Sequence, residues 1–307
     1  MVWLLLILLV GGALAPFVVD HLRPKTSADE RNAAKGHLAA LPQGQTYITW
    51  DGPEDGKILV AVHGLTTPSY VYDALVPGLV AMGYRVMRYD HIGRGLSDPP
   101  TAPQTAGFFI DHLCAILEHE AIDPPEQVTL MGYSMGGSIV SAFAAEHPDR
   151  VSQLILLAPA GLGITESSGA VFARRVPLIG DWLMEIYGRW SLKSALQAER
   201  QERIEVGGVV DKQLDAFAKR GYLRAVLSSM RGILSDSQED VHDTIAKSGC
   251  PVAAIWGESD ETIPLQGMST LGQVNRDAKQ IAIKGAGHGL AYSHPKDVLD
   301  ALQKLIK

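Results

Sequence analysis

The segment Gly-Tyr-Ser-Met-Gly-Gly at residues 132–137 most strongly constrains how this chain can fold. It follows an apolar run and precedes an alanine-rich stretch of helical character, so we expect a strand, a sharp turn and a helix with Ser134 at the apex. Gly132 and Gly136 avoid side chains where the strand and helix pass closely. A serine in such a turn takes a strained backbone conformation at a helix N-terminus, where developing negative charge is favoured. The segment therefore predicts a nucleophilic serine, although an ordinary Gly/Ser turn has the same pattern.

Apolar β-like runs alternate with helical patterns over most of the chain, which predicts an α/β fold with a mostly parallel sheet and helices on both faces. From about 161 to 236 the alternation stops, so a helical lid is expected after the strand at 151–157, taken as the sixth of the core. The expected strands are 45–50, 57–62, 84–89, 127–131, 151–157, 252–256 and 279–283, and the expected helices 70–82, 105–121, 138–146, 265–274 and 295–306.

Composition limits the partners and cofactors of the chain. A net charge of −7 without a long basic run argues against nucleic acid. Cys114 and Cys250 are too few for a disulfide framework, so free thiols are expected. No cluster of His, Cys, Asp and Glu has metal-ligand spacing, so no metal or cofactor is expected, and no protein partner is inferred. We divide the chain into an N-terminal hydrophobic segment (1–22), a linker (23–44), a core (45–160 and 237–307) and a lid (161–236).

Residues 3–19 form an almost unbroken apolar run that, as a helix, is about 26 Å long, slightly short of a hydrocarbon core of about 30 Å. The run has no polar face, so a membrane anchor or a cleaved signal peptide is expected. The anchor is favoured because no basic residue precedes the run and Pro16 follows the best cleavage site. Basic residues follow it at Arg23 and Lys25, which favours a cytoplasmic catalytic body; the alternative is export after signal-peptide cleavage.

A nucleophilic serine needs an oriented base. His288 is the candidate because it lies in a Gly-rich loop after the last expected strand, where α/β sheets place ligand chemistry. His112 and His119 are expected to be solvated on one helical face, and His294 to begin the final helix. The base needs an acid, and three acids follow the strand at 252–256, with Asp260 favoured over Glu258 and Glu261.

An oxyanion hole needs two N–H donors. We expect one from Met135, the residue after the nucleophile, and one from Leu65, in the loop after an early strand. The side chain of His63 is expected to be structural. We expect substrate contacts from Thr66, Tyr133 and Leu290, which lie close in sequence to Leu65, Ser134 and His288.

Taken together, these motifs resemble the α/β-hydrolase family over residues 46–307. They are His63-Gly64, Asp90-x-x-Gly93-x-Gly95-x-Ser97, Gly132-x-Ser134-x-Gly136-Gly137, Gly257-x-x-Asp260-x-x-x-Pro264 and Gly287-His288. The resemblance implies a Ser134–His288–Asp260 triad and a lid. Combined with the N-terminal hydrophobic segment, it is a resemblance to serine esterases and membrane-associated monoacylglycerol-lipase-type hydrolases. A small-molecule ester or lipid substrate is expected.

Alternatives remain open at this point. The same triad serves carbon–carbon bond hydrolases of the meta-cleavage type and cofactor-free haloperoxidases or perhydrolases, and a catalytically dead member could be a binding protein. The early lid is rich in large apolar residues, including Phe172, Trp182 and Tyr187. These either pack onto the core or contact a bilayer and admit acyl chains.

Overall fold

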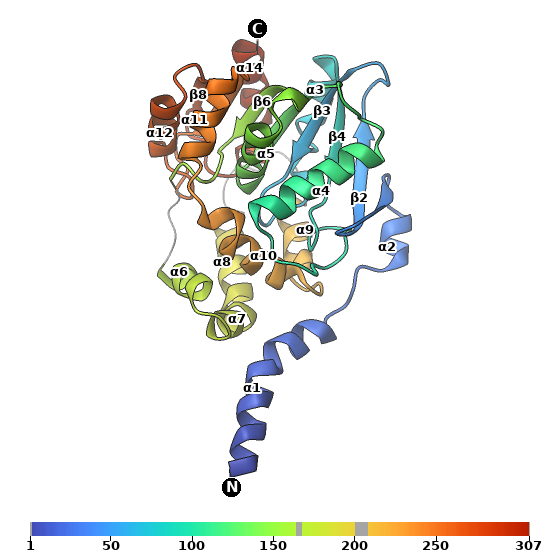
Figure 1. The fold of residues 1–307 in the computed structure, drawn as a ribbon, viewed down its shortest axis with the longest axis vertical. Helices are drawn as coiled ribbons and strands as arrows, with labels where there is room; N and C mark the ends of the chain where they lie inside the picture. Colours follow the sequence, from blue (N-terminus) through green and yellow to red (C-terminus); the bar gives the residue numbers. More distant parts are fainter. Residues whose placement is uncertain (1, 164–167, 200–207, 307) are drawn as a thin grey trace.

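The computed structural model describes residues 2–163, 168–199 and 208–306. Within them, eight strands form one sheet in the order β1-β2-β4-β3-β5-β6-β7-β8 (Figure 1). The β1–β2 and β2–β4 pairs are antiparallel, and the remaining pairs are parallel, which confirms the mostly parallel sheet. The strands are β1 (His37–Leu41), β2 (Gly44–Asp51), β3 (Lys57–Val62), β4 (Tyr84–Tyr89), β5 (Val128–Tyr133), β6 (Val151–Leu157), β7 (Val252–Gly257) and β8 (Lys279–Ile283).

Helices cover both faces of the sheet. One face packs against α4 (Ala106–His119), α5 (Met135–Glu146), α11 (Glu239–Ser248) and α12 (Gln266–Val274), whose apolar side chains share one buried cluster. The other packs against η1 (Ser69–Tyr72), α3 (Val76–Ala81), α13 (Leu290–Ser293) and α14 (Pro295–Leu305). Two short 3-10 helices, η2 (Pro148–Arg150) and η4 (Ile233–Ser235), precede β6 and α11 along the chain.

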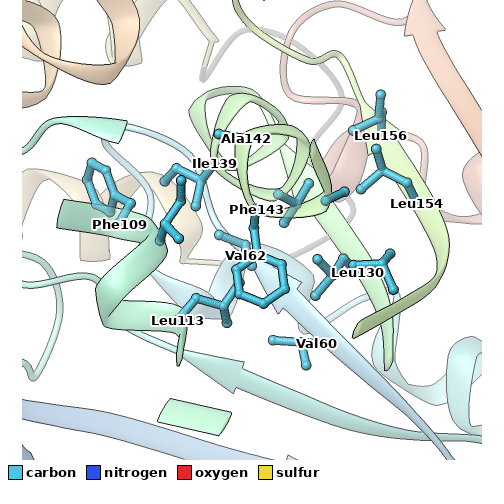
Figure 2. Close-up of a cluster of buried hydrophobic side chains, with 14 of the residues drawn as sticks. Val60, Val62, Phe109, Leu113, Leu130, Ile139, Ala142, Phe143, Leu154 and Leu156 are labelled. Carbon is cyan, nitrogen blue, oxygen red and sulfur yellow. The ribbon is translucent and has the colours of Figure 1, made fainter. Parts of the chain in front are cut away.

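Strand β3 is buried on both faces, which explains why polar and apolar residues do not alternate in its sequence. Val60 and Val62 point into the cluster under α4 and α5, whereas Leu59 and Ala61 point into the opposite cluster. Figure 2 shows the first of these clusters, in which Phe143 of α5 lies over the sheet. All four of these side chains are fully buried, so the strand that precedes His63 and Leu65 is held from both sides.

Two expectations differ from the structure. The stretch expected as a linker contains helix α2 (Ala28–Asn32) and strand β1, whose sequence His-Leu-Ala-Ala-Leu has no β-branched residue and gives a weak strand signal. β1 is held by its antiparallel pairing with β2, and its presence makes β6 the sixth strand. The expected helix at 70–82 is divided into η1 and α3, with a proline in the first turn of α3.

A helical insertion lies between β6 and β7, gathered at one end of the sheet (Figure 1). It has a small core of its own, which includes Met184, Phe217, Tyr222 and Leu223. Residues 164–167 and 200–207 of the expected lid lie outside the described residues. The insertion comprises α6 (Ser168–Arg175), α7 (Ile179–Leu183), η3 (Met184–Gly188), α8 (Arg189–Glu199), α9 (Val209–Ala216) and α10 (Tyr222–Arg231).

The large apolar residues of the early insertion divide into two sets. Met184 is buried in the insertion core and Leu183 packs against it, as the packing interpretation requires. A second set is between 47% and 70% exposed, too exposed for packing onto the core: Phe172, Leu178, Ile179, Ile186, Tyr187 and Trp190.

Helix α1 (Val2–Leu22) is, among the described residues, the one helix long and apolar enough to cross a membrane by length and composition. Only 6% of its most apolar window is buried, so it is not a core helix. Its middle and end contact the insertion: Trp182 Nε1 donates to the Gly12 carbonyl at 2.9 Å. Asp20 is 1% exposed and accepts the Gly221 N–H at 2.8 Å, with Arg224 Nε also at 2.8 Å. The apolar helix is therefore attached to α7 and to the first turn of α10.

Candidate active site

The turn between β5 and α5 has the conformation that its sequence predicts. Ser134 has φ 53° and ψ −120°, a strained backbone for a residue with a side chain. A Cβ on Gly136 would lie 2.0 Å from the Val62 carbonyl oxygen, and one on Gly132 would lie 2.4 Å from the Gly136 oxygen. Both glycines are therefore required by close backbone approach, and the serine lies at the N-terminus of α5.

A hydrogen-bonded relay connects the three residues predicted as a triad. His288 Nε2 lies 3.0 Å from Ser134 Oγ, and His288 Nδ1 lies 2.8 Å from Asp260 Oδ2. The Asp260 side chain is fully buried and its Oδ1 accepts the N–H groups of Thr262 and Ile263, each at 2.8 Å. These bonds fix the carboxylate so that it accepts the Nδ1 proton, which leaves Nε2 free to accept the serine proton.

The structure also separates the three acids that follow β7. Glu258 accepts the Gly285 N–H at 3.2 Å and so holds the start of the loop that carries His288. Glu261 is exposed. Of the three acids, Asp260 is the one that the described hydrogen bonds pair with His288.

The loop after β3 lies against the serine. A Cβ on Gly64 would lie 3.2 Å from Ser134 Cβ, which places the backbone of the predicted Leu65 donor beside the nucleophile. Met135, the other predicted donor, is the first residue of α5. The loop that carries Leu65 and the first turn of α5 therefore lie side by side at Ser134.

The loop is held by two buried histidines. His63 Nε2 accepts the His91 N–H at 2.9 Å, so its Nδ1 carries the proton and donates to the Gly64 carbonyl at 2.8 Å. His91 Nε2 donates to the His63 carbonyl at 2.9 Å. Burial lowers the pKa of His63 to about 3 and that of His91 well below its usual value. His63 is thus a neutral structural group, as its side chain was expected to be.

A third buried histidine corrects an expectation. His112 is not solvated: it is fully buried and its Nε2 pairs with Thr46 Oγ1 at 2.8 Å. Burial lowers its pKa to about 3. The sequence pattern failed because this side of α4 packs against β2 and β4, where Thr46 pairs with the imidazole and the Tyr89 ring lies edge-on to it.

The serine and histidine open into a cavity of about 220 Å³. Three of the predicted residues, Leu65, Thr66 and Tyr133, line it. Tyr133 also donates from its hydroxyl to the His288 carbonyl at 2.9 Å. Leu290 is not among the residues that line this cavity; it is fully buried in the cluster under α14, because α13 turns it into the core.

Part of the cavity wall comes from residues that the sequence pattern did not single out. The insertion contributes Leu192, Gln213 and Phe217, and the core contributes Thr67, Thr262 and Tyr292. Of these, Gln213 carries a detectable signal, since it is a polar residue at the helical spacing of the apolar inward face of α9.

A surface cluster also escaped the sequence pattern. His37, His119 and Glu120 place their ligand atoms within 4.8 Å of one another. Glu120 Oε1 pairs with both imidazoles, at 2.8 Å and 3.0 Å, and Oε2 accepts from Trp50. The group lies outside the lining of the serine cavity, and its spacing is invisible in sequence because His37 precedes Glu120 by 83 positions.

Comparison with known proteins finds a matching family model, similar hydrolase sequences and a similar solved structure. A family model described as serine aminopeptidase, S33, matches residues 53–293. The monoacylglycerol lipase abhd6-B of Xenopus laevis is 26% identical over 57% of this chain and 55% of its own length, so the match spans about half of that relative. A pimeloyl-(acyl-carrier protein) methyl ester esterase of Aeromonas hydrophila is 25% identical over 82% of this chain and 96% of its own. The enol-lactonase structure from Burkholderia xenovorans LB400 superposes with a TM-score of 0.72 at 20% identity, covering 88% of this chain and 99% of that one.

Proposed function

The chain belongs to the α/β-hydrolase family, and from this premise we propose that it hydrolyses carboxylic esters through an acyl-enzyme formed on Ser134. The observation that carries the proposal is the relay Asp260–His288–Ser134 opening into a cavity of about 220 Å³. Lipid esters, including monoacylglycerols, are the proposed substrate class. The Xenopus lipase and the Aeromonas esterase are both ester hydrolases by name, which supports this choice.

The proposed reaction has two steps. His288 Nε2 takes the proton of Ser134 as its oxygen attacks the ester carbonyl, and Asp260 stabilises the imidazolium that forms. The Leu65 and Met135 N–H groups stabilise the oxyanion, each by about 3 kcal/mol in the transition state. His288 then protonates the leaving alcohol, and a water activated by the same base releases the acid.

The insertion acts as a lid in this proposal. It contributes Leu192 and Phe217 to the cavity, so apolar lid side chains lie beside the nucleophile. We also propose that α1 anchors the chain in a membrane, with the catalytic body on the cytoplasmic face because Arg23 and Lys25 follow the helix. The exposed Tyr187 and Trp190 then reach into the bilayer, since the insertion bonds Gly12 in the middle of α1 and η3 contacts the same helix.

The test is a substrate panel on the full chain in detergent micelles. It contains monoacylglycerols and p-nitrophenyl esters of increasing acyl length, an aminoacyl p-nitroanilide and a vinylogous diketone. Ester turnover is expected to dominate and to fall by about 10⁴-fold or more in Ser134→Ala, while Ser152→Ala, an exposed serine on β6, retains it. Undiminished esterase activity in Ser134→Ala would refute the proposal, as would a preference for the anilide or the diketone.

The membrane proposal has a separate test. Alkaline carbonate extraction of membranes is expected to leave the full chain in the pellet, and protease added to sealed inside-out vesicles is expected to digest the catalytic body. Recovery of the protein in the carbonate supernatant would contradict the anchor, and protection of the body in those vesicles would contradict the orientation.

A further inference from the structure

One polar residue interrupts the apolar inward face of α9. Val209, Gln213 and Phe217 follow one another at intervals of four residues and therefore share a face of the helix. All three are buried, and Gln213 is 1% exposed. A leucine or methionine would fit this position by size and polarity, so the amide needs a reason.

The two polar atoms of the Gln213 side chain have different environments. Nε2 donates to the hydroxyl of Thr67, in the loop that follows β3. Oε1 is buried and has no hydrogen-bond partner among the described residues. Buried carbonyl oxygens in folded proteins are nearly always paired, so an unpaired one suggests a partner that arrives from elsewhere.

The position of this amide suggests what that partner is. Gln213 lines the same cavity as Ser134 and His288, and Thr67 lines it as well. The bond to Thr67 holds the amide against the loop that carries Leu65, so Gln213 has a fixed place in the wall of the cavity that contains Ser134. An oxygen acceptor there pairs with a donor on the substrate.

The geometry points to Gln213 Oε1 as the acceptor for a free hydroxyl of the substrate, in the cavity where the ester meets Ser134. This inference rests on the proposed ester hydrolysis at Ser134 and narrows its substrate class to hydroxyl-bearing esters. The hydroxyl can belong to the alcohol, as in a glycerol monoester, or to the acyl chain, as in a hydroxyacyl ester. Leu65, Leu192 and Phe217 provide the apolar remainder of the wall. A site of this kind rejects an analogue without the hydroxyl, because the buried acceptor then stays unpaired.

The test compares matched esters on the full chain. The alcohol arm uses 1-decanoylglycerol and 2,3-dimethoxypropyl decanoate, which differ only in methylation of the two hydroxyls. The acyl arm uses methyl 3-hydroxydecanoate and methyl decanoate. In at least one arm, the wild-type protein is expected to favour the hydroxyl-bearing ester in kcat/KM, and Gln213→Met is expected to reduce that preference about tenfold. The arm that responds identifies which side of the ester carries the hydroxyl.

A matched control is available elsewhere in the chain. Gln238 is also a buried glutamine with an unpaired Oε1, but it lies at the start of α11 and outside the cavity lining. Gln238→Met therefore reproduces the loss of a buried amide and is expected to leave both preferences unchanged. Thr67→Val releases the Gln213 amide and is expected to weaken the same preference; it also provides the measurement if Gln213→Met does not fold.

The outcomes separate this inference from the proposed function. If the wild-type protein cleaves the esters but shows no hydroxyl preference, or if Gln213→Met lowers both members of each pair equally, Gln213 only packs and the inference is overturned. An unchanged preference in Thr67→Val, with Gln213→Met unfolded, overturns it as well. If the wild-type protein cleaves none of the esters and a fluorophosphonate does not label Ser134, the proposed function itself fails.

Discussion

Arg94 Nη2 donates a hydrogen bond to Ser229 Oγ at 2.8 Å, which ties the loop after β4 to helix α10 of the insertion. The guanidinium is 1% exposed, and Nε donates to the Leu65 carbonyl at 3.1 Å, in the predicted oxyanion loop. It also donates to the Ile92 and Ala225 carbonyls and to Gln104 Oε1. One side chain thus joins the core, the oxyanion loop and the insertion through neutral acceptors, and burial lowers its pKa to about 10.

Replacing Arg94 is expected to destabilise the contacts among the core, the predicted oxyanion loop and the insertion. Arg94→Met leaves several buried oxygens without a donor, so the free energy of unfolding should fall by about 3 kcal/mol or more. Arg276→Met, at an exposed position, should change it by less than about 0.5 kcal/mol. Urea unfolding followed by circular dichroism measures both. Equal stability of the two variants would show that Arg94 does not hold the insertion.

Asp260→Asn is expected to lower kcat by about 10⁴-fold on an ester substrate. The carboxamide of the variant can still accept the two backbone N–H groups through its oxygen, but its NH₂ group then donates toward His288 Nδ1. The imidazole proton moves to Nε2, which can no longer accept from Ser134. Glu258→Gln is the matched control, since Glu258 bonds the backbone of the same loop, and it should cost about tenfold or less. A comparable loss in the two variants would argue against Asp260 as the orienting acid.

The buried histidines predict a loss of stability in mild acid. Burial lowers the pKa of His112 to about 3, against about 6.5 in an unfolded chain. Between these values the unfolded state binds a proton that the folded state does not, so the free energy of unfolding falls as pH decreases. Each such histidine contributes a slope of about 1.4 kcal/mol per pH unit. His63 and His242, with pKa values lowered to about 3 and about 4, act in the same direction.

The contribution of one histidine can be isolated by substitution. His112→Gln is expected to reduce the dependence of unfolding free energy on pH between 6 and 4 by about 2–3 kcal/mol over the interval. Urea unfolding at a series of pH values measures it. Identical slopes in the variant and the wild-type protein would mean that His112 titrates alike in the folded and unfolded states.

Asp20 is expected to stabilise the insertion from outside the catalytic body. Its carboxylate binds the N–H of Gly221, at the start of α10, and Arg224 within the helix. Asp20→Ala removes the acceptor of the Gly221 N–H and the partner of Arg224, whose side chain is 39% exposed, so the free energy of unfolding should fall by about 1–2 kcal/mol. In detergent micelles this variant should be cleaved faster by protease within the insertion, whereas Asp29→Ala, at an exposed position, should match the wild-type protein. Unchanged cleavage in Asp20→Ala would show that α1 does not restrain the insertion.

Much of this arrangement can be predicted from the sequence because backbone geometry demands particular residues there. Gly136 is required by the approach of the Val62 carbonyl, and the loops after β7 and β8 follow apolar runs that mark strand ends. The side on which Leu290 points depends on the short helix α13, and no local pattern determines it. Burial of His112 depends on strands distant in sequence, and the unpaired oxygen of Gln213 depends on a contact with Thr67 across 146 positions.

The order of the strands in the sheet also affects when the protein becomes active as it folds. Ser134 follows β5, near the middle of the sheet, whereas His288 follows β8, at its edge. The nucleophile turn can therefore form on a partial sheet, but its base arrives only when the edge strand pairs with β7. The proposed ester turnover should thus appear during refolding only after most of the helical signal has returned, and it would then report that the sheet is complete.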